Sequence, residues 1–194
     1  MGFEVVKKAT WNKTLEQCLL FNEERDAAYH KLSSYEPQRS TKYSAGYDFK
    51  MPFGITCQPG KKYKIPTGFK WCPYDVTIDI RRRVKNYDSG YYTNQCYTFD
   101  SNDGNCFLAL YPRSSLGIKK GFRLLNTTGV IDYDYYNNPQ NEGIIIVAFE
   151  VDTPVTLYPG DKFCQGVIHF CAINGGEIEP GATRQGGIGS TGSN

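Results

Sequence analysis

The feature that most constrains the fold is a succession of short strand-like runs separated by turn signals. Val76, Ile78 and Ile80 alternate with polar residues, and Pro59-Gly60 and Pro66-Thr67-Gly68 punctuate neighbouring runs. Alternation with a period of two is typical of half-buried strands, and Pro-Gly clusters end them. Many short strands with frequent turns predict an all-β sandwich or barrel.

Four further runs have strand character. We expect strands over residues 91–99, 106–111, 143–151 and 163–170, with the first of them returning from the alternating run through a turn at 86–90. The run from Ile144 to Phe149 is apolar on both faces. Such a run predicts a strand at the centre of a closed β-structure.

One helix is expected, near the N-terminus. Thr14 and Gln17 fit a capping box, and Leu15 and Leu19 begin an apolar spacing that continues to Leu32. Serines and a proline then end the pattern. The prediction is a helix that starts at about Thr14.

Composition narrows the class of protein. The 22 basic and 20 acidic residues of the 194-residue chain leave a net charge of +2, which argues against a dedicated nucleic-acid binder. We see no signal-peptide core and no run long enough for a membrane helix. The seven cysteines include no CxxC pair. We therefore expect reduced thiols rather than zinc ligands, and a cytoplasmic location in a bacterium or a phage-infected host.

Five short segments carry candidate chemistry. PRSSLG at 112–117 joins an arginine fork to two hydroxyls, which suits a phosphate. NTTGVIDYDY at 126–135 offers amides to a flat polar base and an aspartate to a water molecule. The glycines of RQGGIGSTG at 184–192 allow an anion nest. AGYDF at 45–49 and GDKFCQG at 160–166 complete the set. Singly, each segment also fits an ordinary turn, hairpin or tail.

Together and in this order, the five segments resemble the motifs of the trimeric all-β dUTPases. The resemblance implies a distorted jelly-roll barrel, a homotrimer with active sites shared between subunits, and hydrolysis of dUTP to dUMP and pyrophosphate. It also implies Mg²⁺ held mainly by the triphosphate and water. The long segment after Tyr135 and the spacing after Arg184 resemble the bacterial and phage branch of the family.

The resemblance also implies roles for individual residues. Asp132 would activate the attacking water, Tyr135 would support the deoxyribose, and Asp48 would either touch the metal shell through water or brace the arginines. The uracil edge would be read by Asn126, Gly129, Val130 and Ile131. The phosphates would be bound by Arg113, Ser114, Ser115 and Gln165 and by a closing lid of Arg184, Gly186, Gly187, Ile188, Gly189, Ser190 and Thr191. Ser115 and Ile188 replace the usual glycine and phenylalanine of the family.

Two alternatives stay open. The dCTP deaminases share the fold and an RSSL motif, but Ala148 stands where their catalytic glutamate would be. A regulatory protein of this fold would bind a protein partner through the inserted segment of about residues 72–105, which contains three consecutive arginines. Arg81 and Arg83 share a strand face with Asp75 and Asp79, which favours a solvated, internally paired face.

The chain is expected to divide into three parts. Residues 1–37 form a helical extension, and residues 38–173 form the β-core with the inserted hairpin. Residues 174–194 are rich in glycine and poor in apolar side chains, so they cannot pack as a core element and would serve as the lid.

Overall fold

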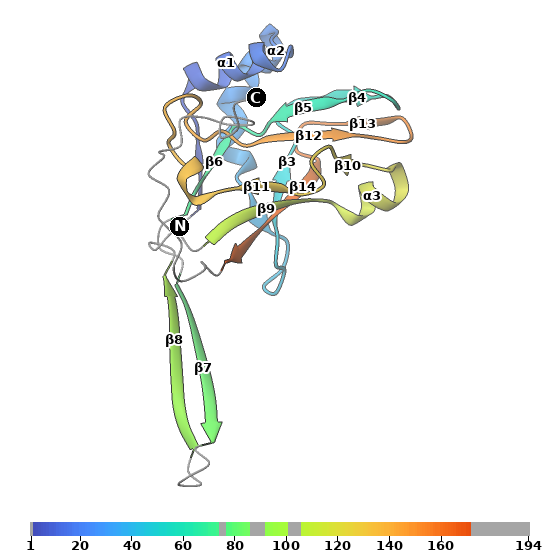
Figure 1. Ribbon diagram of the computed structural model, residues 1–194. Coiled ribbons are helices and arrows are strands. Elements are labelled where there is room, and N and C mark those ends of the chain that lie inside the picture. Colours follow the sequence, from blue (N-terminus) through green and yellow to red (C-terminus); the bar gives the residue numbers. More distant parts are fainter. Residues whose placement is uncertain (1, 74–76, 86–91, 101–105, 172–194) are drawn as a thin grey trace, which may run out of the picture.

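Most of the regular structure is β, as the sequence predicts (Figure 1). The computed structural model describes residues 2–73, 77–85, 92–100 and 106–171, the two middle ranges by their backbone alone. The helices are α1 (Lys8–Gln17), α2 (Glu23–Ala27) and α3 (Ser114–Lys120), with 3-10 turns η1 (Ala28–Tyr35) and η3 (Tyr133–Tyr135). The strands are β1 (Gly2–Val5), β2 (Gln38–Arg39), β3 (Tyr47–Lys50), β4 (Ile55–Cys57), β5 (Tyr63–Pro66), β6 (Phe69–Cys72), β7 (Thr77–Lys85), β8 (Tyr92–Asp100), β9 (Cys106–Pro112), β10 (Arg123–Leu124), β11 (Gly129–Ile131), β12 (Ile146–Glu150), β13 (Val155–Leu157) and β14 (Lys162–Phe170).

Antiparallel sheets enclose one hydrophobic core. A five-stranded sheet has the order β11-β9-β14-β3-β2, and a three-stranded sheet has the order β10-β12-β5. The pairs β1-β6, β13-β4 and β7-β8 form the remaining sheets. Phe49 and Phe163 from the first sheet meet Phe149 from the second and Phe122 from the loop before β10 in a single buried cluster. The all-β class is therefore confirmed.

The N-terminal segment differs from the prediction. Helix α1 begins at Lys8 and ends at Gln17, whereas the sequence predicts a helix that starts at about Thr14. Thr14 lies inside α1, and its hydroxyl donates to the Thr10 carbonyl at 2.7 Å instead of capping a new helix. Leu19 adopts φ +57°, and the Leu19 and Leu20 amides return to Glu16 and Leu15 at 2.9 and 2.8 Å. These bonds form a Schellman motif, so the chain turns at Leu19.

The same segment also contributes a strand and core side chains. β1 pairs antiparallel with β6, in the register Phe3 opposite Trp71. Val6, Trp11 and Leu15 are fully buried in the common core. The extension therefore packs as part of the β-body rather than as a separate helical unit.

The apolar run at 144–149 is a central strand with one buried face. β12 starts at Ile146 and lies between β10 and β5. Val147 and Phe149 are buried, whereas Ile146 and Ala148 on the other face are half-buried. The expected central position is confirmed within the three-stranded sheet, and the half-buried second face lines a pocket described below.

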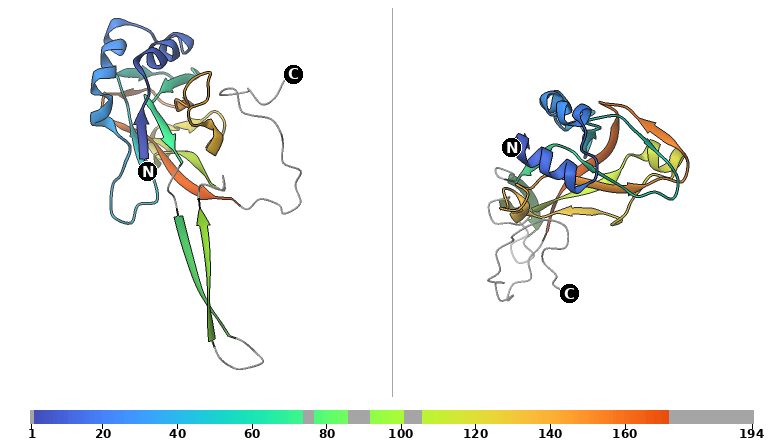
Figure 2. Two further views of the ribbon diagram at one scale, coloured as in Figure 1. Left: turned by 90° about the vertical axis from the view of Figure 1, so that its left-hand side faces the viewer. Right: turned by 90° about the horizontal axis from the view of Figure 1, so that it is seen from above.

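The inserted hairpin is confirmed in its backbone. β7 pairs with β8 in register from Thr77 opposite Asp100 to Lys85 opposite Tyr92. No other described strand pairs with either of them. In Figures 1 and 2 the hairpin extends away from the rest of the molecule, at the end opposite α1 and α2.

The six cysteines whose side chains the structure describes are free thiols in a mixture of environments. Cys57, Cys106 and Cys164 are buried, whereas Cys18, Cys72 and Cys171 are half-exposed. Among the described residues, no helix is long and apolar enough to cross a membrane.

Candidate functional site

The first cluster of predicted site residues forms where β3, β14 and β9 run side by side. Gln165 on β14 lies opposite Asp48 on β3 and opposite Tyr111 on β9. Arg113 directly follows β9 and precedes α3. Three segments that are far apart in sequence therefore place their polar side chains together on the three central strands of the five-stranded sheet.

Asp48 is the centre of this cluster. Its side chain is only 2% exposed and accepts from Arg113 through Oδ1 and from the Ser40 hydroxyl through Oδ2. The Lys162 ammonium lies 2.9 Å from the same Oδ2. Burial raises the pKa of Asp48, but the hydrogen bonds from Ser40 and Lys162 and the charges of Arg113 and Lys162 outweigh it, so the pKa lies below its ordinary value. The carboxylate is ionised and fixes two cations at the surface.

Lys162 and Ser40 are members of this cluster that the sequence analysis missed. The pairing of β14 with β3 shifts register between Lys162 and Cys164. Such a bulge redirects the side chains that precede it, which places Lys162 beside Asp48. Lys162 lies inside the segment GDKFCQG, and this position in a candidate motif was the one sequence feature that pointed to it.

Gln165 and the paired serines flank Arg113. The Gln165 amide donates to the Pro112 carbonyl at 3.4 Å, and a side chain at Gly46 would come within 2.7 Å of its Oε1. Glycine at position 46 therefore leaves room for the amide. Ser114 and Ser115 are exposed in the first turn of α3, where the sequence predicts a simple turn.

The second cluster surrounds the segment from β10 to β11, which the sequence predicts as a hairpin although the two strands pair in different sheets. A pocket of about 50 Å³ is lined by all four residues expected to read uracil, Asn126, Gly129, Val130 and Ile131, together with Leu110, Leu124, Ile146, Val147 and Ala148. The Leu125 amide donates to the Ala148 carbonyl at 2.9 Å, which ties the hairpin to β12. A Cβ at Gly129 would lie 3.1 Å from the Leu110 side chain, so glycine allows the close approach of β11 to β9.

Asp132 and Tyr135 follow β11 directly. Asp132 is half-buried, caps η3, and lines a second cavity of about 320 Å³ with Cys106, Phe107, Tyr133, Asp134 and Cys171. Tyr135 is 7% exposed. Its hydroxyl donates to the Ile144 carbonyl at 3.1 Å and accepts from the Asn141 amide at 2.9 Å. The tyrosine ring is therefore held in one orientation.

Within one chain, Asp132 lies at the opposite end of β9 from Arg113, whereas Gly129 of the second cluster pairs with Leu110, near the Arg113 end. Ile131, just before Asp132, lies opposite Leu108, whereas Arg113 follows the far end of the strand. At about 3.3 Å per residue, the intervening strand separates Asp132 from Arg113 by roughly 15–20 Å. The structure therefore brings together Asp48, Arg113 and Gln165, and gathers Asn126, Gly129, Val130 and Ile131 around one pocket, while Asp132 and Arg113 stay apart along β9.

The predicted lid residues, Arg184 and Gly186 to Thr191, lie outside the described residues. Among the residues that are described, no three of His, Cys, Asp or Glu gather as a metal cage. Both oxygens of Asp48 already face cations or a hydroxyl donor. This geometry fits the predicted role of Asp48 in bracing Arg113, and the predicted contact with the metal shell through water stays a prediction.

Comparison with known proteins places the chain in a family. It is 35% identical to the deoxyuridine 5'-triphosphate nucleotidohydrolase of Lactococcus lactis over 160 residues, covering 81% of this chain and 87% of the relative. It is 29% identical to the protein of the same name from Neisseria gonorrhoeae over 170 residues, which cover 84% and 91% of the two chains. A search with family models found no match.

The fold agrees with the sequence relationship. The crystal structure of the Streptococcus mutans dUTPase aligns with a TM-score of 0.57 and 28% identity, covering 91% of this chain and all of that one. The fold and the site define an all-β protein with a small pocket beside β11 and a separate cationic cluster around Asp48. The chain belongs to the dUTPase family.

Proposed function

We propose that this protein hydrolyses dUTP to dUMP and pyrophosphate. The observation that carries the proposal is the pocket of the β10–β11 hairpin, in which all four predicted uracil-reading residues lie immediately before Asp132. A narrow, mostly apolar pocket with a few backbone and amide groups suits a pyrimidine base. The relatives named above carry the matching activity in their names.

Asp132 acts as the general base in this mechanism. Its carboxylate takes a proton from water while the water oxygen bonds to the α-phosphorus and the bond to the pyrophosphate oxygen breaks. Tyr135 lies under the deoxyribose, and its fixed ring leaves no space for a 2′-hydroxyl. The hairpin and η3 are adjacent in sequence, so base recognition and water activation share one rigid element.

The phosphates are bound by the cationic cluster and the lid. Arg113 supplies a planar fork for phosphate oxygens, Ser114 and Ser115 supply exposed hydroxyls beside it, and Gln165 supplies a half-buried amide. Arg184, Gly186, Gly187, Ile188, Gly189, Ser190 and Thr191 close over the triphosphate in this proposal. Asp48 keeps Arg113 extended toward the ligand.

Mg²⁺ fits this arrangement as a substrate-bound ion. When bound, it neutralises the phosphate charge and orients the triphosphate. The described residues offer no cage of carboxylates, and Asp48 is engaged by cations. The triphosphate and water are therefore its ligands, and Asp48 contributes at most through water.

The separation of the two clusters supports a homotrimer with shared active sites. One triphosphate cannot span roughly 15–20 Å from Asp132 to Arg113 of the same chain. A neighbouring copy that supplies its cationic cluster to this hairpin completes the site, and a closed symmetric assembly repeats the arrangement.

Two inactive variants test this assembly. Asp132→Asn and Arg113→Ala are purified separately, dissociated, mixed and reassembled. Random mixing restores about one quarter of wild-type activity if each site draws these residues from two chains. No recovery in mixed oligomers, or a monomer by light scattering, contradicts the shared site.

The activity itself is tested with dUTP, dTTP, dCTP and UTP in the presence of Mg²⁺. We expect pyrophosphate release from dUTP to be far faster than from the other three nucleotides, and we expect that release to be lost in Asp132→Asn with dUTP binding retained. Near-normal turnover of Asp132→Asn would refute the mechanism. Ammonia release from dCTP would instead favour a deaminase, which Ala148 in the base pocket argues against.

A second function is supported by the inserted hairpin. β7 and β8 pair only with each other among the described strands, and they extend away from the body (Figure 1). We propose that residues 72–105 contact a protein partner. A pull-down with this segment deleted checks the proposal, and unchanged recovery of the partner rules it out.

A further inference from the structure

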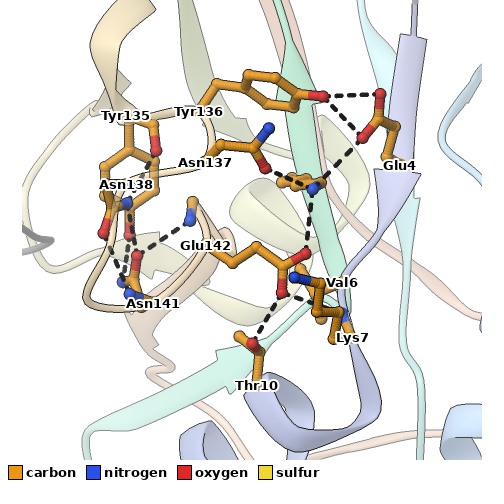
Figure 3. A network of polar contacts seen from close by, with 12 residues as sticks. Glu4, Val6, Lys7, Thr10, Tyr135, Tyr136, Asn137, Asn138, Asn141 and Glu142 are labelled. Atoms are coloured by element: carbon orange, nitrogen blue, oxygen red, sulfur yellow. Dashed lines mark hydrogen bonds and ion pairs between the residues drawn. The ribbon is translucent and has the colours of Figure 1, made fainter.

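The loop from Tyr135 to Gly143 is closed on itself around the sugar-binding tyrosine. The Asn138 amide donates to the Tyr135 carbonyl at 2.8 Å and to the Asn141 side chain at 2.7 Å. The Asn141 amide in turn reaches the Tyr135 hydroxyl at 2.9 Å (Figure 3). The position of the Tyr135 ring therefore depends on the conformation of this loop.

Two residues of the loop have a backbone conformation that L-amino acids disfavour. Asn137 has φ +54° and Glu142 has φ +60°. The left-handed region costs about 1–2 kcal/mol per residue with a side chain, although asparagine tolerates it better than glutamate. The two residues are joined by a bond from the Asn137 amide to the Glu142 carbonyl at 3.2 Å. Tertiary contacts must hold the loop in this form.

Lys70 on β6 makes those contacts. Its ammonium lies 2.6 Å from Asn137 Oδ1 and 3.1 Å from Glu142 Oε1, so it binds the side chains of both strained residues. The Lys70 side chain is only 9% exposed. Glu4 lies 3.4 Å from it, and its ammonium is 5.1 Å from the centre of the Tyr136 ring. A buried ammonium is retained when it is fully partnered, as it is here.

Glu142 connects this clamp to the N-terminal segment. Its Oε2 accepts from the Lys7 backbone amide at 3.1 Å and from the Thr10 hydroxyl at 2.8 Å. Burial raises the pKa of Glu142, but these bonds and Lys70 outweigh it, so the pKa lies below its ordinary value. Tyr136 donates to both Glu4 oxygens, at 2.9 and 2.8 Å. β1, α1 and β6 thus all bind the loop that follows Asp132 (Figure 3).

We propose that Lys70 and Glu142 are positioning residues that hold the Tyr135 platform and thereby set the preference for deoxyribose over ribose. This inference rests on the proposed dUTPase activity. Neither side chain lies in the base pocket or in the Asp132 cavity. They act through the loop, which joins Tyr135 to Asp132 by a bond from the Tyr135 amide to the Asp132 carbonyl at 3.1 Å.

The test measures kcat and KM for dUTP and UTP in Lys70→Met, Lys70→Arg and Glu142→Gln. A displacement of the ring by a fraction of an ångström lets ribose enter, so we expect the dUTP-to-UTP ratio of kcat/KM to fall roughly tenfold in Lys70→Met. Lys70→Arg retains the charge and recovers most of that ratio. Glu142→Gln keeps the shape of the side chain and lowers the ratio by a smaller factor.

Lys8→Met is the matched control. Lys8 pairs with Asp26 at 2.5 Å in the same N-terminal segment and lies 5.2 Å from the centre of the Tyr29 ring. This variant loses a lysine ion pair without loosening the loop from Tyr135 to Gly143. Its dUTP-to-UTP ratio of kcat/KM therefore stays at the wild-type value.

The possible outcomes separate the two proposals. Wild-type protein that fails to hydrolyse dUTP refutes the proposed function. Active variants with an unchanged dUTP-to-UTP ratio refute the positioning role, even if their melting temperatures fall. Should Lys70→Met not fold, the ratio in Glu142→Gln decides the question in the same way.

Discussion

Replacement of Asp48 by asparagine tests the cationic cluster most directly. The substitution keeps the size of a side chain that is 2% exposed but removes the charge that Arg113 and Lys162 share. Removing one partner of a fully buried ion pair lowers the free energy of unfolding by about 3–5 kcal/mol, whereas removing one partner of an exposed pair lowers it by less than about 1 kcal/mol. The Arg113 and Lys162 side chains are 30% and 41% exposed, so water compensates part of the loss. We expect a destabilisation of about 2 kcal/mol.

That loss converts into a fall in melting temperature of about 4–8 °C for a chain of this size. Circular dichroism during heating measures it. Arg113 also loses the anchor that holds it extended, so we expect KM for dUTP to rise roughly tenfold. Asp152→Asn is the control, because Asp152 pairs with Arg123 at 2.5 Å while both side chains are more than half exposed. Its melting temperature and KM should stay close to those of the wild-type protein.

The pH dependence supplies a second check on the same cluster. The pKa of Asp48 is lower in the folded than in the unfolded protein, so its charge stabilises the fold above the unfolded value of about 3.9. That contribution is lost as the pH falls through the folded pKa. The difference in melting temperature between wild type and Asp48→Asn should be constant near neutrality and shrink below about pH 4. Equal stability of the two proteins at pH 7 would refute the reasoning.

Two further outcomes are expected. Gly143 and Gly60 have φ +81° and +75°, but only at Gly143 would a Cβ meet backbone, the Tyr135 carbonyl at 2.6 Å. In urea unfolding, Gly60→Ala should lower the free energy of unfolding by about 1 kcal/mol, and Gly143→Ala should lower it by at least about 1 kcal/mol more. Equal losses in the two variants would contradict the steric explanation. Burial raises the pKa of Cys164 to about 12, so the thiol is unreactive in the native protein at pH 8. Titration of the folded proteins with Ellman's reagent should give the same number of reactive thiols per chain for Cys164→Ser as for wild type. A number lower by one in Cys164→Ser would show that the Cys164 thiol is accessible.

Local pattern predicted the strands well and the helix poorly. β8, β9 and β14 lie within a residue or two of the expected ranges, because alternation along a strand is read directly from neighbouring residues. The capping-box prediction at Thr14 failed for a tertiary reason. Trp11 and Leu15 are drawn into the core, which fixes α1 earlier in the chain. Leu19, which is 92% exposed, then takes the left-handed position that ends the helix.

The sequence by itself determined the all-β class and the inserted hairpin, because turn residues and strand alternation are local properties. It also predicted that Asn126, Gly129, Val130 and Ile131 act together, and these residues line one pocket because they are near neighbours in the chain. Only the tertiary structure decided the rest. The bulge that carries Lys162 to Asp48, the clamp of Lys70 on Asn137 and Glu142, and the separation of Asp132 from Arg113 along β9 depend on the pairing of distant strands. Register between such strands is set by the packing of the whole core, and no short segment contains it.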